Sequence, residues 1–485
     1  MPVNAAKWLA PFYLLPADLM VNQLQLDSRK VKAGDVFIAI PGLAQHGNIY
    51  IEQALAKGAA LVLTESGHYA DARIVVMPQL IKILPELAAS FYQQPTEQFD
   101  LVGITGTNGK SSVAFFINQL ALSVQRKAQV IGTLGYGNIK HLTPLANTTP
   151  HFIDLQRIIS QAKTEQADLV AMEVSSHALA QQRLAGLQFK VTVFTNLTRD
   201  HLDYHGSMQE YGAAKALLFQ PDMAQSAVIN VADEFGRQLA QTTSLPCLVY
   251  GNPEQCQGFS RFLAYSDVLA TPSGYQFVVS TENERYSLNL PLLGEFNIQN
   301  VLAAIGSMQL LGYDLASLVK AAEKLTAVPG RMEQFVCEHE FTAVIDYAHT
   351  PDALQQALIS LKQHSTNHIW CVFGCGGDRD KGKRPLMGQI AEKYADHVII
   401  TADNPRSEDV LAICADIAAG MSADAYYQIE PNRQAAIKLA LISAQPEDIV
   451  LIAGKGHETL QIIGQQQLIY DERAYVQQLV TELAL

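Results

Sequence analysis

The sequence predicts an α/β protein with mostly parallel sheets, divided into three domains. Short apolar runs typical of strands alternate with helical patterns along almost the whole chain, which favours parallel sheets covered by helices. The length of 485 residues corresponds to about three domains of roughly 150 residues each. Two polar joints that contain proline interrupt this alternation, so each is expected to separate two domains.

The two joints give the expected domain boundaries. Residues 93–100 (QQPTEQFD) are polar and precede an apolar strand, and residues 327–333 (AVPGRME) end a helical pattern with a Pro-Gly pair. We therefore expect a smaller N-terminal α/β domain at 1–97, a central domain at 98–330 and a C-terminal domain at 331–485. Polar and apolar residues alternate from 265 to 290, which predicts an antiparallel excursion in the central domain.

Composition excludes several classes of partner. The chain has 47 Asp and Glu against 34 Lys and Arg, a net charge of −13, which disfavours nucleic acid or an anionic membrane surface. Anionic ligands must then be bound by local basic loops. The first twenty residues contain one Lys, one Asp and two internal prolines, so they do not form a signal peptide, and no run approaches the about 18 apolar residues of a membrane span. We expect a cytoplasmic protein without membrane insertion.

The six cysteines fit a reduced compartment. They lie in mostly apolar surroundings without paired metal-ligand spacing; they are Cys247, Cys256, Cys337, Cys371, Cys375 and Cys414. Only Cys371 and Cys375 are close together, and apolar neighbours predict a buried strand there. We expect structural thiols rather than a metal or redox site.

The most informative motif is GITGTNGKSS at residues 103–112. An apolar strand leads into a glycine-rich turn that ends in Lys110 and two hydroxyls, and the next residues have helical apolar spacing. Glycines let backbone N–H groups approach phosphate oxygens, and Lys110 supplies a charge. Ser111 or Ser112 can reach Mg²⁺, and the following helix directs its positive end at the anion. In the common G-x-x-x-x-G-K-[ST] pattern the first glycine would stand at Ile104, whereas here it is Gly106. A turn that binds nothing would need neither the lysine nor the hydroxyls, so we predict a loop that binds the phosphates of a nucleotide.

Two further strands of the central domain end in polar residues. Residues 169–174 predict a strand that carries Glu173, whose carboxylate could hold Mg²⁺ opposite the phosphate loop or make only a structural bond. Residues 192–196 lead into the loop LTRDHLDYHG at 197–206. This loop indicates a metal or general-base neighbourhood, although its H-x-x-x-H spacing lacks the helix and the Glu of a zinc protease, and a histidine in such a loop is more often structural.

Four polar loops that contain Gly or Pro follow expected strands in the C-terminal domain, at residues 345–351, 373–379, 401–406 and 452–458. At the carboxyl ends of parallel strands, such loops form a ligand crevice. The segment DRDKGKR at 378–384 is either a solvated loop or the local positive charge that the acidic chain otherwise lacks.

Three other features are weak when taken alone. They are the NTTP motif at 147–150, the GEFNIQN segment at 294–300 and Lys215. They also fit a simple turn, a capped helix start and a solvated helix residue, respectively.

Together these motifs resemble those of the Mur ligases, which use ATP to add amino acids to the UDP-N-acetylmuramoyl precursor of bacterial peptidoglycan. The resemblance covers essentially the whole chain, and TGTNGKS at 105–111 is similar to the nucleotide loop of that family. More narrowly, the chain resembles the members that add meso-2,6-diaminopimelate to the D-glutamate of UDP-N-acetylmuramoyl-L-alanyl-D-glutamate. The motifs that carry this similarity are LDSR (26–29), NTTP (147–150), EVSSHAL (173–179), DHLDYH (200–205) and DNPR (403–406). The family implies a central P-loop ATPase domain, a Rossmann-like C-terminal domain and a smaller N-terminal domain.

The resemblance also implies a role for each matching residue. The catalytic set would be Lys110, Glu173, His201 and Lys215. Among the metal ligands, Ser111 and Glu173 would hold one Mg²⁺, His201 would help with a second metal, and Lys215, as a carbamate formed with CO₂ (N6-carboxylysine), would bind Mg²⁺ beside the phosphates. The ATP contacts would be Gly106, Thr107, Asn108, Gly109, Lys110, Ser111, Ser112, Asn297, Asn300, Arg331, Asp346, Tyr347 and His349. The contacts to the UDP-muramoyl dipeptide would be Leu26, Ser28, Leu43, Ala44, Gln45, Asn147, Thr148, Thr149, Ser175, Gln181 and Arg183. The diaminopimelate contacts would be Arg379, Asp403, Asn404, Pro405, Arg406, Gly454 and Glu458.

Arg406 and Arg379 carry the physical argument for diaminopimelate. This amino acid differs from lysine by a second carboxylate, which an arginine can accept bidentately and which would be absent from lysine. The expected reaction is attack of the D-Glu γ-carboxylate on the γ-phosphate of ATP, followed by displacement of phosphate from the acyl phosphate by the amine. Closure of the outer domains on the central one is expected to align the two reactants.

Other functions stay open from the sequence. The chain could be a P-loop ATPase or kinase with another acceptor, or a nucleotide-gated binding protein without net chemistry. Among ligases the nearest competitor adds L-lysine, and folylpolyglutamate synthase is more remote because it would not need the domain that carries LDSR. The expected partners are ATP, the UDP-muramoyl dipeptide and meso-diaminopimelate. We expect a monomer that serves peptidoglycan and cell wall synthesis, and through them cell shape, cell division and the cell cycle.

Overall fold

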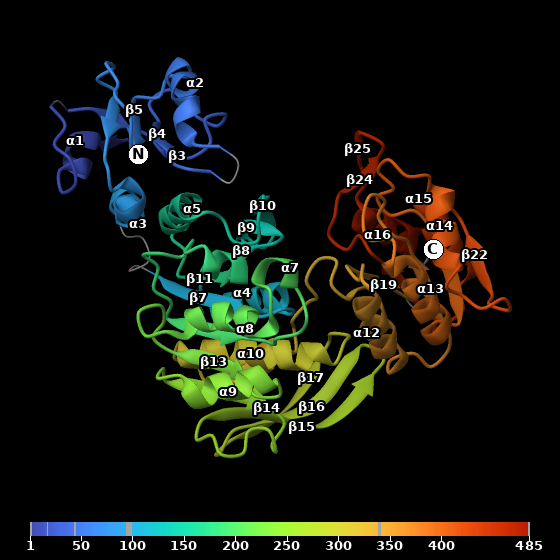
Figure 1. The fold of residues 1–485 in the computed structure, drawn as a ribbon. Coiled ribbons are helices and arrows are strands. Elements are labelled where there is room, and N and C mark those ends of the chain that lie inside the picture. Colours follow the sequence, from blue (N-terminus) through green and yellow to red (C-terminus); the bar gives the residue numbers. More distant parts are fainter. Residues whose placement is uncertain (1, 17, 43–44, 94–98, 338–340, 484–485) are drawn as a thin grey trace. The chain divides into compact units, whose positions relative to one another are not determined.

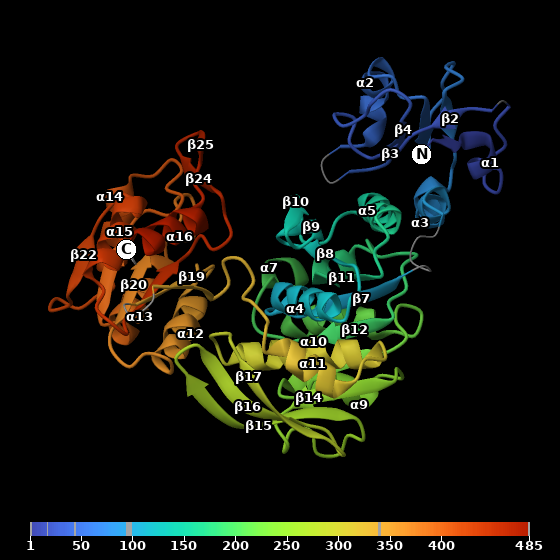
Figure 2. The same ribbon diagram turned by 180° about the vertical axis from the view of Figure 1, so that it is seen from behind.

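The computed structural model describes residues 2–16, 18–42, 45–93, 99–337 and 341–483. The chain forms two compact units. The first consists of Met1–Thr107, Val124–Ala227 and Thr242–Pro246, and the second of Asn108–Ser123, Val228–Gln241 and Cys247–Leu485. Three larger sheets follow one another along the chain (Figure 1 and, from behind, Figure 2). The predicted α/β class is confirmed, while the domain boundaries at 97/98 and 330/331 stay a prediction.

The N-terminal part is built on a parallel sheet whose four strands lie in sequence order. They are β3 (Leu24–Gln25), β4 (Val36–Ala39), β5 (Leu61–Thr64) and β6 (Ile74–Val76). Alternate residues of a strand point to opposite faces: Val36 and Ile38 join one buried cluster and Phe37 and Ala39 another. The first cluster includes α1 (Ala5–Leu9) and α3 (Leu80–Phe91), the second α2 (Ile51–Ala56). Helices therefore cover both faces. This part also contains two short antiparallel strands, β1 (Val3–Asn4) and β2 (Met20–Val21), and the 3₁₀ helix η1 (Gly47–Tyr50).

The middle sheet has the order β10-β9-β8-β11-β7-β12-β13-β14-β15-β16-β17. Strands β8, β11, β7 and β12 are mutually parallel, so β7 lies between two strands whose carboxyl ends reach the same edge. Loops after such strands meet at one place. The strands are β7 (Asp100–Thr105), β8 (Ala128–Gly132), β9 (Gly135–Asn138), β10 (His141–Thr143), β11 (Leu169–Glu173), β12 (Val191–Phe194), β13 (Ala227–Asn230), β14 (Cys247–Gly251), β15 (Phe262–Thr271), β16 (Gly274–Ser280) and β17 (Arg285–Leu290).

The antiparallel excursion predicted for residues 265–290 is confirmed. β16 pairs antiparallel with both β15 and β17, and a bulge lies between Ser266 and Leu269. The helices of this section are α4 (Lys110–Ser123), α5 (Phe152–Thr164), α6 (Ser176–Ala180), α7 (Leu202–His205), α8 (Met208–Ala216), the 3₁₀ helix η3 (Leu217–Phe219), α9 (Glu234–Thr242), α10 (Phe296–Leu310) and α11 (Leu315–Ala322).

The C-terminal sheet has the order β18-β19-β23-β20-β21-β22. All neighbours are parallel except β18 with β19. The run β22-β21-β20-β23 has the 3-2-1-4 order of a Rossmann-like fold, and the order in which the strands follow one another reverses between the parallel strands β20 and β23. The strands are β18 (Glu333–Val336), β19 (Thr342–Asp346), β20 (Ile369–Phe373), β21 (His397–Ile400), β22 (Tyr427–Ile429) and β23 (Ile449–Ala453), followed by the hairpin β24 (Leu460–Ile463) and β25 (Gln466–Ile469).

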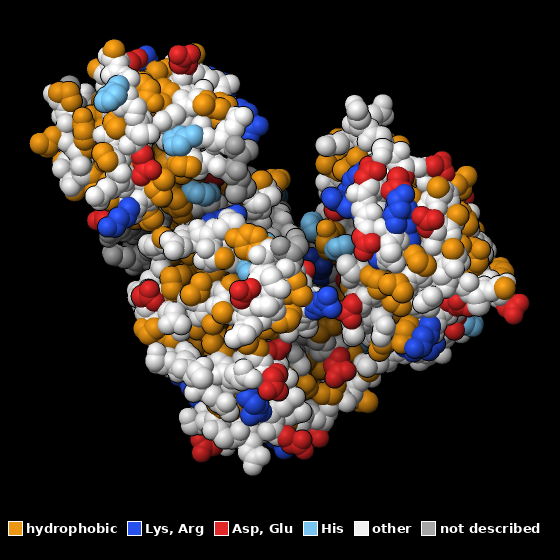
Figure 3. All heavy atoms as spheres, in the orientation of Figure 1, with side chains coloured by type: hydrophobic (Ala, Val, Ile, Leu, Met, Phe, Trp, Pro, Cys, Tyr) orange, Lys and Arg blue, Asp and Glu red, His pale blue; other side chains and the backbone are white. Residues whose placement is uncertain are grey.

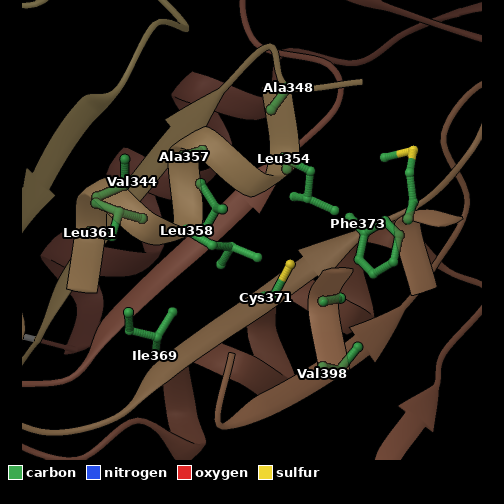
Figure 4. Packing of buried hydrophobic residues seen from close by; sticks show 14 of the residues in the cluster. Val344, Ala348, Leu354, Ala357, Leu358, Leu361, Ile369, Cys371, Phe373 and Val398 are labelled. Carbon is green, nitrogen blue, oxygen red and sulfur yellow. The ribbon is translucent and has the colours of Figure 1, made fainter. Parts of the chain in front are cut away.

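Helices cover both faces of this sheet. Cys371 and Phe373 of β20 pack in one cluster with α12 (Pro351–Lys362), α13 (Lys383–Tyr394) and α14 (Val410–Ala418). Trp370 and Val372 of the same strand pack in the other with α15 (Arg433–Ser443) and α16 (Glu472–Leu483). Figure 4 shows Cys371 among the side chains of the first cluster. As expected, Cys371 and Cys375 are free and buried, and burial raises the pKa of both thiols.

The surface matches the acidic composition. On the face in Figure 3, the described Lys and Arg side chains lie scattered among Asp and Glu rather than in one continuous field. Among the helices of the described residues, none is both long and apolar enough to cross a membrane.

Truncation of Leu358 should destabilise the C-terminal sheet and its helices. Leu358 is fully buried on α12, whereas its neighbour Ile359 is 36% exposed. We expect Leu358→Ala to lower the free energy of unfolding by about 2–5 kcal/mol and the control Ile359→Ala by about 1 kcal/mol or less. Urea unfolding measured in a Trp8→Phe background would report this region, because Trp370 is then the only tryptophan. Equal losses for both variants would contradict the packing described.

Candidate active site

The phosphate loop joins β7 to α4 as the sequence predicts. The Thr107 N–H donates to the Asn196 carbonyl at 2.9 Å, the Thr107 hydroxyl donates to the Thr198 carbonyl at 3.2 Å, and the Thr198 N–H donates back to that hydroxyl at 3.0 Å. The loop is therefore tied to the segment that follows β12. Asn108 is exposed, while Ser111 and Ser112 are buried in the first turn of α4, which begins at Lys110.

Two glycines explain why this loop departs from the common pattern. Ile104 is a fully buried residue of β7, so the first glycine is not needed there. Gly106 has φ 153° and a side-chain carbon on it would overlap the Thr195 hydroxyl. Gly109 has φ 85° and such a carbon would lie 2.5 Å from Asn300 Oδ1. Only glycine adopts these conformations without strain and leaves this space.

Two asparagines of α10 lie beside the loop at Gly109. Asn300 donates through its amide to Asn297 Oδ1 at 3.0 Å, and Asn297 donates to the Leu293 carbonyl at 2.8 Å. Both side chains are buried. The structure thus brings together Gly109, Asn297 and Asn300, which the resemblance assigned to one ligand.

Glu173 ends β11 at the same edge of the sheet. It is opposite Ile104 of β7 in the strand register, and it is only 2% exposed. Its carboxylate accepts hydrogen bonds from the Thr133 N–H at 3.0 Å and the Thr133 hydroxyl at 3.1 Å. Sequence reasoning missed Thr133, because the residue that follows β8 carries no motif of its own.

An aromatic cluster surrounds the loop that carries His201. The His177 ring lies 4.9 Å from that of His201, 4.2 Å from Tyr204 and 5.4 Å from His205. His205 Nε2 is 2.9 Å from the Ser176 hydroxyl. His201 has the positive φ of 51° at the start of α7. His205 is thus a packed and hydrogen-bonded residue.

Lys215 is buried, so its interpretation as a solvated helix residue is wrong. It is 1% exposed, and its Nζ lies 4.4 Å from the centre of the Tyr211 ring, one turn earlier on α8. The Tyr211 hydroxyl is 3.3 Å from the Thr107 hydroxyl of the phosphate loop, and burial raises the pKa of Tyr211. Tyr211 therefore connects Lys215 to the loop; the sequence offered only its i, i+4 spacing from Lys215 as a signal.

Five residues assigned to the dipeptide surround the backbone after Glu173. The Thr149 hydroxyl donates to the Glu173 carbonyl at 2.9 Å and accepts from the Ser175 N–H at 3.0 Å. Arg183 donates to the Thr149 carbonyl at 2.8 Å and to Gln181 Oε1. Thr148 is 3.0 Å from Thr133, hydroxyl to hydroxyl. Asn147 is exposed, and its side chain makes no hydrogen bond within the part of the chain that the structure describes.

The residues assigned to the uridine nucleotide lie in the N-terminal part. The buried Ser28 hydroxyl donates to Gln53 Oε1 at 2.6 Å, and Leu26 packs against the first buried cluster. Gln45 Oε1 accepts from the Tyr50 hydroxyl at 3.0 Å. Leu43 and Ala44 lie outside the described residues.

Four residues around the start of the C-terminal sheet form one group. The Arg331 guanidinium lies 4.6 Å from the centre of the Tyr347 ring. Asp346 ends β19 and accepts from the Met332 N–H at 2.8 Å, and burial raises the pKa of its carboxyl. His349 Nδ1 is 2.8 Å from the Tyr347 carbonyl. These contacts bring together all four predicted residues.

A cluster of polar residues lies at the carboxyl ends of β20, β21 and β23. Asn404 Oδ1 accepts from Lys455 Nζ at 3.1 Å, and its amide donates to Glu458 Oε2 at 3.0 Å. Gly454 approaches Asp403, since a side-chain carbon there would lie 2.7 Å from Oδ2. Lys455 is fully buried and was missed in the sequence, although it stands inside the predicted loop 452–458.

Two arginines lie beside Gly376, in the loop after β20. A side-chain carbon on Gly376 would lie 3.0 Å from Arg406 Nη1 and 3.6 Å from Arg379 Cγ. Arg406 Nη1 donates to the Gly377 carbonyl at 2.8 Å, while its Nε and Nη2 donate to no residue that the structure describes. Arg379 is exposed and likewise has no hydrogen bond to the described residues. The carbonyl of Pro405 packs against Gly377. The Nε and Nη2 edge of Arg406 is thus the edge that can donate two parallel hydrogen bonds to a carboxylate.

Comparisons with known proteins cover the same regions. Family models match as the Mur ligase middle domain over residues 104–308, the Mur ligase glutamate ligase domain over 330–456 and the Mur ligase family catalytic domain over 20–92. A curated relative is the UDP-N-acetylmuramoyl-L-alanyl-D-glutamate–2,6-diaminopimelate ligase of Vibrio vulnificus (strain YJ016). It is 42% identical over 489 residues, 99% of this chain and 98% of the relative.

Solved structures agree with this family. A structure of a UDP-N-acetylmuramoyl-L-alanyl-D-glutamate–2,6-diaminopimelate ligase is 35% identical, covers 100% of both chains and has a TM-score of 0.73. The UDP-N-acetylmuramoylalanyl-D-glutamyl-2,6-diaminopimelate–D-alanyl-D-alanyl ligase of Acinetobacter baumannii covers 100% of this chain and 98% of its own, with a TM-score of 0.66 at 18% identity. The second supports the fold alone.

Gly109→Ala should weaken nucleotide binding. The substitution places a side chain at φ 85° and 2.5 Å from Asn300 Oδ1, so the loop must shift. We expect the dissociation constant for an ATP analogue, measured by calorimetry, to rise by about tenfold or more. The control Gly312→Ala has a similar φ of 97° with no atom within 4 Å and should bind as the wild type does. Unchanged affinity in Gly109→Ala would contradict the described loop.

Proposed function

The chain belongs to the Mur ligase family, and on that basis we propose that it is an ATP-dependent ligase that adds meso-2,6-diaminopimelate to the D-glutamate of UDP-N-acetylmuramoyl-L-alanyl-D-glutamate. The observation that carries this proposal is the identity, over almost the full length, to a ligase of that name. The phosphate loop and the two arginines beside Gly376 are the features that such a ligase needs.

Phosphoryl transfer is the first chemical step of the proposal. The γ-carboxylate of D-Glu attacks the γ-phosphate of ATP, the bond to ADP breaks, and an acyl phosphate forms. Lys110 and the backbone N–H groups of the phosphate loop oppose the negative charge that spreads over the phosphoryl oxygens. The loop is held rigidly by Thr107, so these donors need little reorganisation during the step.

The second step forms the amide. The neutral amine of diaminopimelate attacks the acyl carbon, phosphate leaves with the electron pair of the broken C–O bond, and the amine loses its proton. Water would hydrolyse the acyl phosphate unproductively, so the amine must be held in place before the acyl phosphate forms.

The donor set fits Mg²⁺, which is implied by the family. No group of three or more His, Cys, Asp or Glu within the described residues is arranged to hold a metal ion. Mg²⁺ commonly takes only one or two carboxylates and fills its other positions with phosphate oxygens and water. We propose Ser111 and Glu173 as ligands of one Mg²⁺ and His201 as a ligand of a second metal ion; bound Mg²⁺ would neutralise charge on the phosphates.

We propose Lys215 as the site of a carbamate. Its side chain is almost fully buried, and its Nζ lies against the ring of Tyr211. Reaction with CO₂ converts the ammonium into a group with two oxygens, which would add a further oxygen ligand for Mg²⁺.

Arg406 is proposed to select diaminopimelate over lysine. Its Nη1 donates to the Gly377 carbonyl, so its Nε and Nη2 would donate to the carboxylate that lysine lacks. Arg379 lies beside Arg406. Asn404, Asp403 and Glu458 supply acceptors for the ammonium groups of the same substrate. A site built for a carboxylate leaves an arginine unpaired when lysine binds, which disfavours lysine.

The wider role follows from the reaction. The product would be a peptidoglycan precursor, so we propose a cytoplasmic enzyme that serves cell wall synthesis and thereby cell shape and division. We also propose that it acts as a monomer.

One assay tests the proposed reaction. Phosphate release and product mass are measured with ATP, Mg²⁺, UDP-N-acetylmuramoyl-L-alanyl-D-glutamate and either meso-diaminopimelate or L-lysine. We expect an amide product with diaminopimelate and at least about tenfold lower kcat/KM with lysine, because one bidentate ion pair is lost. Comparable turnover of lysine would contradict the proposed preference for diaminopimelate. Formation of ADP without an amide would indicate an ATPase or kinase. Nucleotide binding without turnover would indicate a binding protein.

Lys215→Ala should be nearly inactive and partly restored by small carboxylic acids. The alanine leaves a space into which acetate or formate could place two oxygens, which is the chemistry that the carbamate would supply. We expect kcat to fall by about a hundredfold or more and to recover in part with added acetate. Lys163→Ala, at a partly exposed residue in the last turn of α5, is the control. Full activity of Lys215→Ala would end the carbamate proposal, and ¹³C NMR of the wild type with ¹³CO₂ tests the modification directly.

A further inference from the structure

A buried arginine lies beside the loops that carry Arg379 and Arg406. Arg384, on α13, has a fully buried side chain. Its Nη1 donates to Glu408 Oε2 at 3.0 Å and to Asp416 Oδ2 at 2.8 Å, and its Nη2 donates to Glu408 Oε1 at 2.9 Å and to the Gly376 carbonyl at 3.4 Å. One cation therefore joins the loop after β20 to the segment after β21.

A second set of hydrogen bonds closes the same junction. Glu408 Oε1 accepts from the Asp378 N–H at 2.6 Å, and Asp378 accepts from both the hydroxyl of Ser407 at 2.6 Å and its N–H at 3.1 Å. The bond from Arg384 lowers the pKa of Glu408 to about 2, and the bonds from Ser407 lower the pKa of Asp378. Both carboxylates are therefore charged in the neutral pH range.

The two joined segments are those that present Arg379 and Arg406. Arg379 follows Asp378 directly, and Arg406 precedes Ser407 directly. Arg406 has a positive φ of 52°, which a non-glycine residue holds only when its surroundings impose it. Its Nη1 also depends on the Gly377 carbonyl. A shift of either segment would move one or both guanidinium groups.

We propose that Arg384 is a positioning residue for substrate selection: with Glu408, Asp378 and Ser407 it holds Arg379 and Arg406 where they accept the second carboxylate of the amino-acid substrate. Arg384 is fully buried and touches no substrate. The inference rests on the proposed function, because it concerns the same amino-acid site.

A purely structural role predicts a different pattern. Disruption of one partner of a buried ion pair destabilises the fold, and a loss of stability alone would lower the amount of active enzyme, which scales kcat equally for every substrate. Displacement of the two arginines instead raises KM for one substrate and changes the preference between diaminopimelate and lysine. The two roles are separable by steady-state kinetics.

Arg384→Lys and Ser407→Ala test the proposal. Lysine keeps the charge but cannot make the forked contacts to Glu408 and Gly376. We expect Arg384→Lys to raise KM for meso-diaminopimelate by about tenfold or more and to lower the preference over lysine by a similar factor. KM for ATP and for the UDP-muramoyl dipeptide should change less than about twofold. Ser407→Ala, an exposed change that leaves Arg384 in place, should raise KM for diaminopimelate by about threefold to fivefold.

Ser422→Ala is the matched control. Ser422 donates through its N–H and its hydroxyl to Glu392, the same arrangement as Ser407 with Asp378, but outside both segments. It should leave every KM unchanged. Melting temperatures identify a variant that does not fold; in that case Ser407→Ala decides the outcome.

Two results would overturn the inference. One is an unchanged KM for diaminopimelate in Ser407→Ala and in folded Arg384→Lys; the other is an equal change in KM for all three substrates. Failure of the proposed function is distinguishable, because the wild type itself would then form no amide with diaminopimelate.

Discussion

The hydrogen bonds between Thr107 and the segment after β12 are the constraint on which the active site depends. They fix a glycine-rich loop that has no regular structure of its own against a strand that is parallel to β7 and adjacent to it. Because β11 is the other neighbour of β7, Glu173 ends at the same edge. Tyr211 extends the arrangement through its hydroxyl to Thr107 and its ring to Lys215. A phosphate group held by the loop would therefore meet donors and a carboxylate whose positions are set by the sheet rather than by flexible side chains.

The C-terminal sheet repeats the same principle with different chemistry. The order of the strands reverses between the parallel strands β20 and β23, and the loops after these strands carry Arg379 and Lys455. Here buried charged side chains hold the loops in place, whereas the phosphate loop is shaped by glycines. Lys455 is paired with Asn404 and Glu458, and Arg384 is paired with Glu408. A buried ion pair is favourable only when its two partners keep good hydrogen-bond geometry. Other positions of the loops would break this geometry, so the pairs restrict the loops to one arrangement. That restriction suits a site that must distinguish two amino acids that differ by one carboxylate.

Local patterns predicted more of the fold than of the site. The strand, turn and helix at residues 99–122 and the antiparallel excursion at 265–290 were correct, because apolar periodicity and Gly or Pro punctuation act over short distances. Tyr211, Lys455 and Arg384 were missed because their importance comes from partners far away in the sequence, such as Thr107 for Tyr211 and Glu408 for Arg384. The displaced Gly106 was visible in the sequence, but its reason, the contact with Thr195, lies 89 positions further along the chain, as the residue numbers show. Lys215 needed the resemblance to the Mur ligases, because composition alone favoured a solvated helix residue.

The central claim is that ATP activates the D-Glu carboxylate, and oxygen transfer tests it most directly. UDP-N-acetylmuramoyl-L-alanyl-D-glutamate labelled with ¹⁸O in both oxygens of the γ-carboxylate is incubated with ATP, Mg²⁺ and meso-diaminopimelate, and the phosphate released is analysed by ³¹P NMR. An acyl phosphate retains one carboxylate oxygen in the departing phosphate. The account predicts one ¹⁸O atom in each phosphate formed, in equal amount to the amide product. Phosphate free of ¹⁸O would contradict it.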